Sequence, residues 1–262
     1  MMADSLWLIP ACLLVGGVIG FSGGVLGIGG GLFAIPLLGL VLGYEQQAAQ
    51  GTALIMVLPA VLLTVRKYHQ RSPIDLRSAA AGAVSSIVFT WVGAQIALGI
   101  DPWLLRRIYA GFVLLIALFY FRESLGRKAR QRADSDFREV GQVRRWWYFL
   151  VGVFAGLTGG IFGVGGAVLA VPLMTTLFRL RQTSAQALAL TMIVPGTVVA
   201  LSTYAWHGQA HGLVGIPLAL GSLLCVPYGV RLAYALPEAR LKLIFACMLL
   251  IIMALLLARG PA

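Results

Sequence analysis

Two runs of adjacent glycines interrupt otherwise apolar sequence, and they are the residues best suited to bind a ligand through the backbone. The first run is Gly29, Gly30 and Gly31, and the second is Gly165 and Gly166. Because glycine has no side chain, adjacent glycines leave backbone N–H groups uncovered. An apolar helical segment follows each run, so these N–H groups would stand at a helix N-terminus, where the helix dipole favours an anion.

The spacing of the first run excludes the glycine loops that bind nucleotides. The stretch GIGGGL at 27–32 lacks the last glycine of the dinucleotide fingerprint, and no lysine stands near it, as a Walker loop requires. Helix packing is the alternative interpretation for the glycines further upstream. Gly16, Gly20 and Gly24 are spaced four apart, which allows two helices to approach closely.

Polar side chains near the two runs could complete a binding site. The candidate substrate-binding residues combine the glycines with hydroxyl and amide side chains: Ser22, Gly29, Gly30, Gly31, Gln50, Thr52, Thr158, Gly165, Gly166, Gln186 and Thr191. The glutamine amides could donate to an oxyanion. Alternatively, the glutamines are polar helix ends that face the membrane interface, and the threonine hydroxyls bond back to carbonyls of their own helices.

The inventory of acids, bases and metal ligands is too small for an enzyme. There is no H-E-x-x-H motif and no aspartate pair, and the acidic residues fall at termini or in expected loops. The three cysteines form no C-x-x-C pair. His207 and His211 are four residues apart, but glycines interrupt that segment, which favours a solvent loop. The sequence predicts no catalytic residue, no metal and no cofactor.

Composition places these residues in a membrane. Of the 262 residues, 60% are hydrophobic and 11% are charged, whereas soluble domains average about 25% charged residues. With their flanks, apolar segments such as 108–121 approach the ~20 residues that cross a bilayer. The net charge of +11 arises mainly in loops, where the positive-inside rule explains it better than nucleic-acid binding.

An internal repeat organises the chain. GFSGGVLGIGGGLFAIP at 20–36 aligns without a gap with GLTGGIFGVGGAVLAVP at 156–172, and eight of the seventeen positions are identical. The same offset of 136 residues pairs Gln50 with Gln186 and Tyr68 with Tyr204. We predict a first transmembrane repeat at 5–121, a basic cytoplasmic linker at 122–146 and a second transmembrane repeat at 147–258.

Loop charges give the two repeats opposite orientations. The loop at 66–77 is basic, whereas its counterpart at 204–213 has no Lys or Arg. Conversely, 43–47 has no cation, whereas its counterpart contains Arg179 and Arg181. Under the positive-inside rule, equivalent loops therefore lie on opposite sides. We predict an all-α polytopic membrane protein of two inverted-topology repeats, with about 8–10 membrane helices that include broken or half helices at the Gly-rich motifs.

Inverted repeats with paired helix breaks are a signature of secondary transporters. We therefore expect a permease that binds a small anion between the two repeats and has the lipid bilayer, not nucleic acid, as its other partner. Two alternatives stay open. The chain could be a non-transporting membrane scaffold or subunit in which the glycines serve packing only, or it could be an anion channel.

The duplicated glycine motif resembles that of the TauE/SafE family of bacterial membrane permeases. The motif runs from Gly24 through Gly27-Ile28-Gly29-Gly30-Gly31 to Pro36, its copy ends at Pro172, and Ala49-Gln50-Gly51-Thr52-Ala53-Leu54 looks like the element that follows in that family. The second repeat departs from the pattern at Ala167 and at Ala187-Leu188. The resemblance implies transport of sulfite, a sulfonate or another small organic anion across the bacterial inner (cell) membrane. It leaves a homodimer open.

Overall fold

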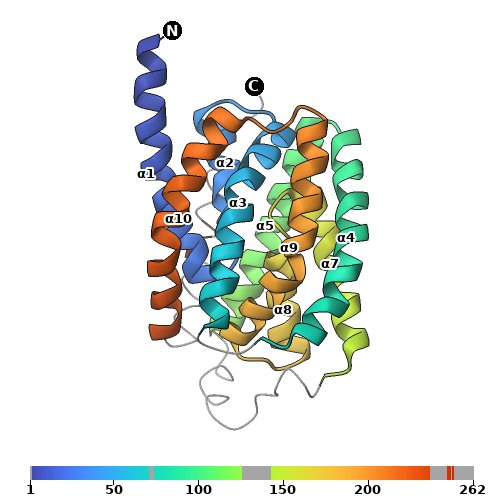
Figure 1. Ribbon diagram of the computed structural model, residues 1–262. Coiled ribbons are helices and arrows are strands. Elements are labelled where there is room, and N and C mark those ends of the chain that lie inside the picture. Colours follow the sequence, from blue (N-terminus) through green and yellow to red (C-terminus); the bar gives the residue numbers. More distant parts are fainter. Residues whose placement is uncertain (1, 71–73, 126–142, 237–246, 249, 251–262) are drawn as a thin grey trace.

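The described part of the chain is helical throughout. The computed structural model describes residues 2–70, 74–125, 143–236, 247, 248 and 250. Within these residues lie nine helices with assigned bounds and no strand (Figure 1). In chain order they are α1 (Met2–Leu26), α2 (Gly31–Val41), α3 (Gln46–His69), α4 (Leu76–Gly99), α5 (Pro102–Leu125), α7 (Arg145–Phe162), α8 (Ala167–Leu177), α9 (Gln182–Trp206) and α10 (Gly212–Ala235). The all-α fold expected from the sequence is confirmed.

Helix lengths agree with a protein that crosses a membrane several times. Six helices are long and apolar enough to span a bilayer: α1 from Ile9, α3, α4, α5 as far as Arg122, α9 and α10. By contrast, α2 and α8 have 11 residues each. At ~1.5 Å per residue they reach ~16 Å, about half the hydrocarbon thickness. The chain therefore combines full spans with half helices, as the glycine motifs predicted.

Helix bounds recur at the offset found in the sequence. The bounds of α8 and α10 equal those of α2 and α4 shifted by 136 residues, and α3 and α9 begin at equivalent positions. In Figure 1 the α1–α2 hairpin opens toward the upper end of the bundle, whereas the α7–α8 hairpin opens toward the lower end. Equivalent elements therefore run in opposite directions, which is the arrangement expected of an inverted repeat.

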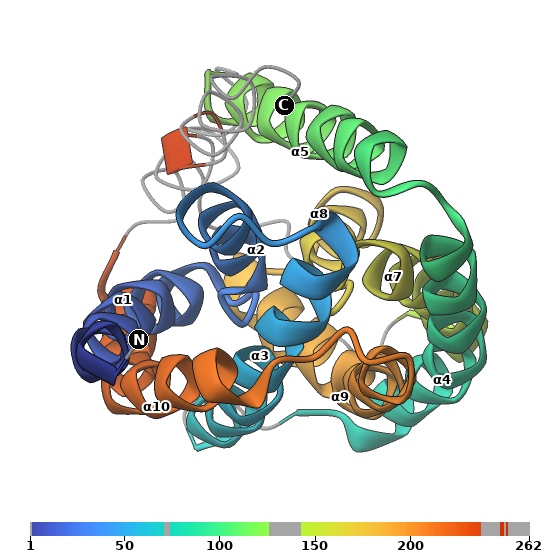
Figure 2. The same cartoon turned by 90° about the horizontal axis from the view of Figure 1, so that it is seen from above.

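Each repeat packs its first helix against the other repeat. α1 lies along α10, and α7 lies along α4, so each of these pairs joins the two halves of the chain. Figure 2 shows α3 and α9 between the two pairs, with α2 and α8 near the centre and α5 outside them. The two repeats are therefore interlocked rather than placed beside one another.

The glycines spaced four apart explain how these helices come so close. In α1, a Cβ at Gly16 or Gly20 would overlap the backbone of α10. In α7, a Cβ at Gly152 or Gly156 would meet the backbone of α4 in the same way. Small residues let two helix backbones touch, which strengthens the van der Waals packing between membrane helices. The packing interpretation is confirmed for these upstream glycines.

Two sequence predictions lie largely outside the described residues. Of the linker at 122–146, only the two ends are described. Of the last apolar segment, 243–258, only residues 247, 248 and 250 are described.

Candidate functional site at the paired helix breaks

Both glycine runs break a helix, as predicted. α1 ends at Leu26 and α2 begins at Gly31, while α7 ends at Phe162 and α8 begins at Ala167. The residues with positive φ in these connections are all glycine: Gly27, Gly29 and Gly30 in the first, and the equivalent Gly163, Gly165 and Gly166 in the second. Residues with a side chain rarely adopt this left-handed backbone, so the connections require glycine.

Gly31 differs from the other glycines of its run because it is the first residue of α2 and has no positive φ. Its counterpart Ala167 is the first residue of α8 and has the same ordinary helical backbone. The second repeat therefore departs from the glycine pattern at a position where left-handed backbone is not needed.

The two breaks lie against each other at the centre of the bundle. A Cβ on Gly31 would lie 3.4 Å from the Cα of Val164. The side chain of Val57, near the middle of α3, reaches both connections. Its Cγ1 atom lies 3.2 Å from the Cβ position of Gly29 and 3.7 Å from that of Gly165. The two glycine runs, which are far apart in the sequence, therefore lie close together in the fold.

Backbone N–H groups at the two helix starts are left without acceptors. Phe33 and Ala34 donate to the Gly30 carbonyl, and the equivalent residues of α8 donate to the Gly166 carbonyl. Among the described residues, the first two N–H groups of α2, at Gly31 and Leu32, have no acceptor, and the same holds for the first two of α8. These residues are buried. Buried N–H groups usually have a partner, so two helix starts with free donors are chemically suited to an anion.

Two tyrosine–glutamine hydrogen bonds cross between the repeats. The Tyr68 hydroxyl donates to Oε1 of Gln186 at 2.8 Å, and the Tyr204 hydroxyl donates to Oε1 of Gln50 at 2.8 Å. All four side chains are fully buried. The first bond, which we call the lower clasp, joins the end of α3 to the start of α9. The second, the upper clasp, joins the start of α3 to the end of α9.

The two clasps differ in how completely their glutamines are bonded. In the lower clasp, Nε2 of Gln186 also donates to the carbonyl of Leu26 at 2.7 Å, at the end of α1. In the upper clasp, Nε2 of Gln50 has no partner among the described residues, although the side chain packs against Gly163 at the α7–α8 break. Gln50 therefore holds a spare buried donor beside the breaks, whereas Gln186 does not.

The predicted hydroxyl residues are not directed at the breaks. Ser22 donates to the Val18 carbonyl at 2.9 Å, Thr158 to the Phe154 carbonyl at 2.8 Å and Thr191 to the Ala187 carbonyl at 2.8 Å. These bonds all run within one helix. Thr52 is buried, and its hydroxyl accepts from the backbone N–H of His211 at 3.1 Å, in the α9–α10 connection. Of the candidate set, the structure brings together the glycines and Gln50, with Gln186 in the lower clasp.

Sequence reasoning missed the role of Tyr68 and Tyr204. The offset of 136 residues already paired these tyrosines, as it paired Gln50 with Gln186. Nothing in that pairing indicated that each tyrosine would bond to the glutamine of the other repeat. The signal in the sequence that could have indicated this role was the occurrence of tyrosine at equivalent positions, near the ends of equivalent apolar helices.

This combination of full spans and half helices in two repeats is typical of membrane transport proteins. The family model described as "Sulfite exporter TauE/SafE" matches residues 12–256, and the chain belongs to this family.

Curated relatives agree with this assignment. A probable membrane transporter protein of Methanocaldococcus jannaschii is 23% identical over 241 residues, covering 87% of this chain and 86% of the relative. One from Xylella fastidiosa is 24% identical over 228 residues, with 86% and 85% covered. The probable membrane transporter protein YunE of Bacillus subtilis is 22% identical over 255 residues, with 94% and 93% covered.

Proposed function

We propose that the protein is a secondary transporter of a small monovalent oxyanion, such as a sulfonate or hydrogen sulfite, which binds at the starts of α2 and α8. The observation that carries this proposal is the set of buried donors without acceptors at the two adjoining breaks. It comprises the first N–H groups of both half helices and Nε2 of Gln50. Donors without acceptors, contributed by both repeats, suit a ligand that has only acceptors. The printed description of the family supports a sulfur oxyanion.

The charge of the substrate follows from the charge of the site. A helix N-terminus carries roughly half an elementary charge, so two of them supply about one positive charge. None of the buried residues described is Asp, Glu, Lys or Arg. A monoanion would therefore be balanced, whereas a dianion would leave one charge unpaired in a medium of low dielectric constant, which is costly.

Alternating access would use the two clasps as gates. The central glycines are buried while both clasps are formed. Opening a path to the lower end separates the end of α3 from the start of α9 and breaks the lower clasp. Opening a path to the upper end breaks the upper clasp. Because the clasps join equivalent residues of inverted repeats, rocking of one repeat against the other can exchange the two states.

Charges at the helix ends support one orientation in the membrane. Cations gather at the lower end, where α3, α5 and α8 end and α4, α7 and α9 begin: Arg66, Lys67, Arg77, Arg122, Arg144, Arg145, Arg179 and Arg181. The described cations at the start of α5, at the other end, are Arg106 and Arg107. By the positive-inside rule, we place the lower end and the linker at 122–146 on the cytoplasmic side of the membrane. We take this membrane to be the inner (cell) membrane.

Counterflow in proteoliposomes tests the proposal. Vesicles loaded with methanesulfonate should accumulate labelled methanesulfonate with saturable kinetics. Gln50→Leu should weaken apparent affinity roughly ten-fold or more, because a hydrogen bond to a charged group contributes about 1.5–3 kcal/mol. The Tyr204 hydroxyl keeps the Gly160 carbonyl as an acceptor at 3.0 Å in that variant. Ser22→Ala, which removes a hydroxyl bonded only within α1, is the matched control.

Each alternative function has its own outcome in this assay. Flux that rises linearly with concentration and does not saturate would indicate an anion channel. No flux of any sulfonate or carboxylate from a folded protein would favour a scaffold.

A further inference from the structure

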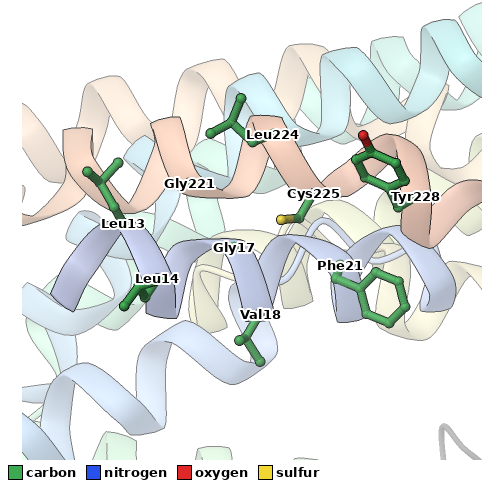
Figure 3. A pocket seen from close by; sticks show the side chains of 9 residues that line it. All are labelled: Leu13, Leu14, Gly17, Val18, Phe21, Gly221, Leu224, Cys225 and Tyr228. Atoms are coloured by element: carbon green, nitrogen blue, oxygen red, sulfur yellow. The ribbon is translucent and has the colours of Figure 1, made fainter. Parts of the chain in front are cut away.

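An apolar groove of about 630 Å³ runs along the outer surface between α1 and α10 (Figure 3). Its walls are apolar apart from the Cys225 thiol and the Tyr228 hydroxyl. Gly17 and Gly221 form part of its floor, and exposed side chains such as Leu14 and Leu224 form its sides. Along α1 the lining runs from Leu13 to Phe21, about 12 Å at 1.5 Å per residue.

The three small residues that line this groove, Gly17, Gly221 and Cys225, have larger counterparts in the other repeat. The equivalent helix pair is α7 with α4, and larger residues stand there at the positions of these three. Val153 replaces Gly17, Ser85 replaces Gly221 and Phe89 replaces Cys225. Phe89 packs against Gly156 of α7, its Cβ 3.2 Å from the glycine's Cβ position. The two helix pairs share their close packing, so packing alone does not require the smaller residues at the groove.

A cation stands at one end of the groove. The guanidinium carbon of Arg231 lies 5.9 Å from the centre of the Tyr228 ring. Both side chains are exposed, and Arg231 is one turn beyond Tyr228 on α10. The repeat-equivalent residue is the uncharged Gln95. The positive charge and the small residues therefore occur together, on the same helix pair.

We propose that this groove binds one anionic glycerophospholipid, with an acyl chain between α1 and α10 and the phosphate beside Arg231. An unbranched apolar chain suits a narrow groove that runs along two membrane helices. A guanidinium at its end pairs with phosphate through charge-assisted hydrogen bonds. The end of α10 lies at the cation-rich end of the bundle, so the headgroup would sit in the leaflet on that side. This site does not depend on which substrate the protein carries.

Native mass spectrometry of the full-length protein tests the site. The protein is equilibrated in detergent with equal amounts of phosphatidylglycerol and phosphatidylcholine that carry the same acyl chains. We expect one retained phosphatidylglycerol. Arg231→Gln, which introduces the residue found in the other repeat, should lower the preference for phosphatidylglycerol about five-fold, since one basic residue near an anionic lipid contributes about that factor. Arg107→Gln, at an exposed cation on α5, is the matched control.

A second variant tests the groove itself. Gly17→Val with Cys225→Phe introduces the pair that the second repeat already accommodates, and it should abolish retention of either lipid. Unchanged preference in Arg231→Gln, together with unchanged retention in the double variant, would overturn the proposal. So would a wild-type dimer that the double variant converts to monomers, because the groove would then hold a second copy of the chain. Arg231→Gln keeps the proposal testable if the double variant does not fold.

Discussion

Breaking one clasp at a time should open the two ends of the protein separately. Tyr68→Phe removes the donor to Gln186 of the lower clasp, and Tyr204→Phe removes the donor to Gln50 of the upper clasp. A neutral hydrogen bond contributes about 1 kcal/mol, so each change should shift its open–closed equilibrium about five-fold.

Labelling of buried cysteines by a membrane-impermeant maleimide measures this shift. The reporters are Ala53→Cys and its repeat equivalent Ala189→Cys, both fully buried, in a background without the three native cysteines. Tyr68→Phe should raise labelling of residue 189 from the cation-rich side several-fold and leave residue 53 unchanged from the opposite side. Tyr204→Phe should do the reverse.

The double variant Tyr204→Phe/Gln50→Leu tests whether the hydrogen bond is the cause, because Nε2 of Gln50 makes no other bond among the described residues. Replacing both partners of a buried hydrogen bond by apolar groups is close to neutral, so labelling should return toward the wild-type level. Equal increases at both reporters in either tyrosine variant would refute the assignment of one clasp to each end. So would unchanged labelling in both tyrosine variants.

Three further predictions concern stability, each measured by unfolding in detergent. Gly30→Ala and Gly43→Ala both place a side chain at positive φ, which costs about 1–2 kcal/mol. The free energy of unfolding should fall by more than this amount only in Gly30→Ala, which should also lose exchange activity. The new Cβ would lie 2.9 Å from Cγ2 of Ile19 in that variant, whereas nothing lies within 4 Å of the Cβ position at Gly43. Gly20→Leu should prevent stable association of α1 with α10, while Gly111→Leu, with nothing within 4 Å, should be tolerated; equal loss would contradict the packing account. Hydrogen bonds from the Ser78 hydroxyl and the Arg77 N–H hold the pKa of Asp75 below its usual value. The stabilisation of the protein by this helix cap is therefore complete above the ordinary aspartate pKa and is lost as the pH falls through the lowered pKa of Asp75. Asp75→Ala should cost about 1 kcal/mol of stability at pH 7 and progressively less in acid. A constant cost across that range would count against the cap.

Much of the fold followed from the sequence because its signals are local. Apolar length indicates a span, and adjacent glycines in an apolar segment indicate a break, since residues with a side chain rarely adopt the left-handed backbone found at Gly30 and Gly166. The repeat then predicted that the second half would show the same elements, and the helix bounds agree with it.

Contacts between elements could not be read in this way. The packing of α1 on α10 of the other repeat depends on how the two halves interlock. The spacing of residues along the sequence does not indicate that arrangement. The hydroxyls of Ser22 and Thr158 were predicted to face the breaks, but each bonds within its own helix. A hydroxyl in a helix can always reach a carbonyl one turn back, so its direction is a matter of rotamer rather than of sequence.

Competition between two anions of similar shape tests the central claim most directly. Methanesulfonate and sulfate both have a tetrahedral sulfur, which bears three oxygens and a methyl group in methanesulfonate and four oxygens in sulfate, and they differ by one unit of charge. If two half-helix starts supply about one positive charge, unlabelled methanesulfonate should compete for labelled methanesulfonate counterflow at least about ten-fold better than sulfate does. Competition by sulfate that equals or exceeds that of methanesulfonate would contradict the assignment of the paired helix starts as a monoanion-binding site.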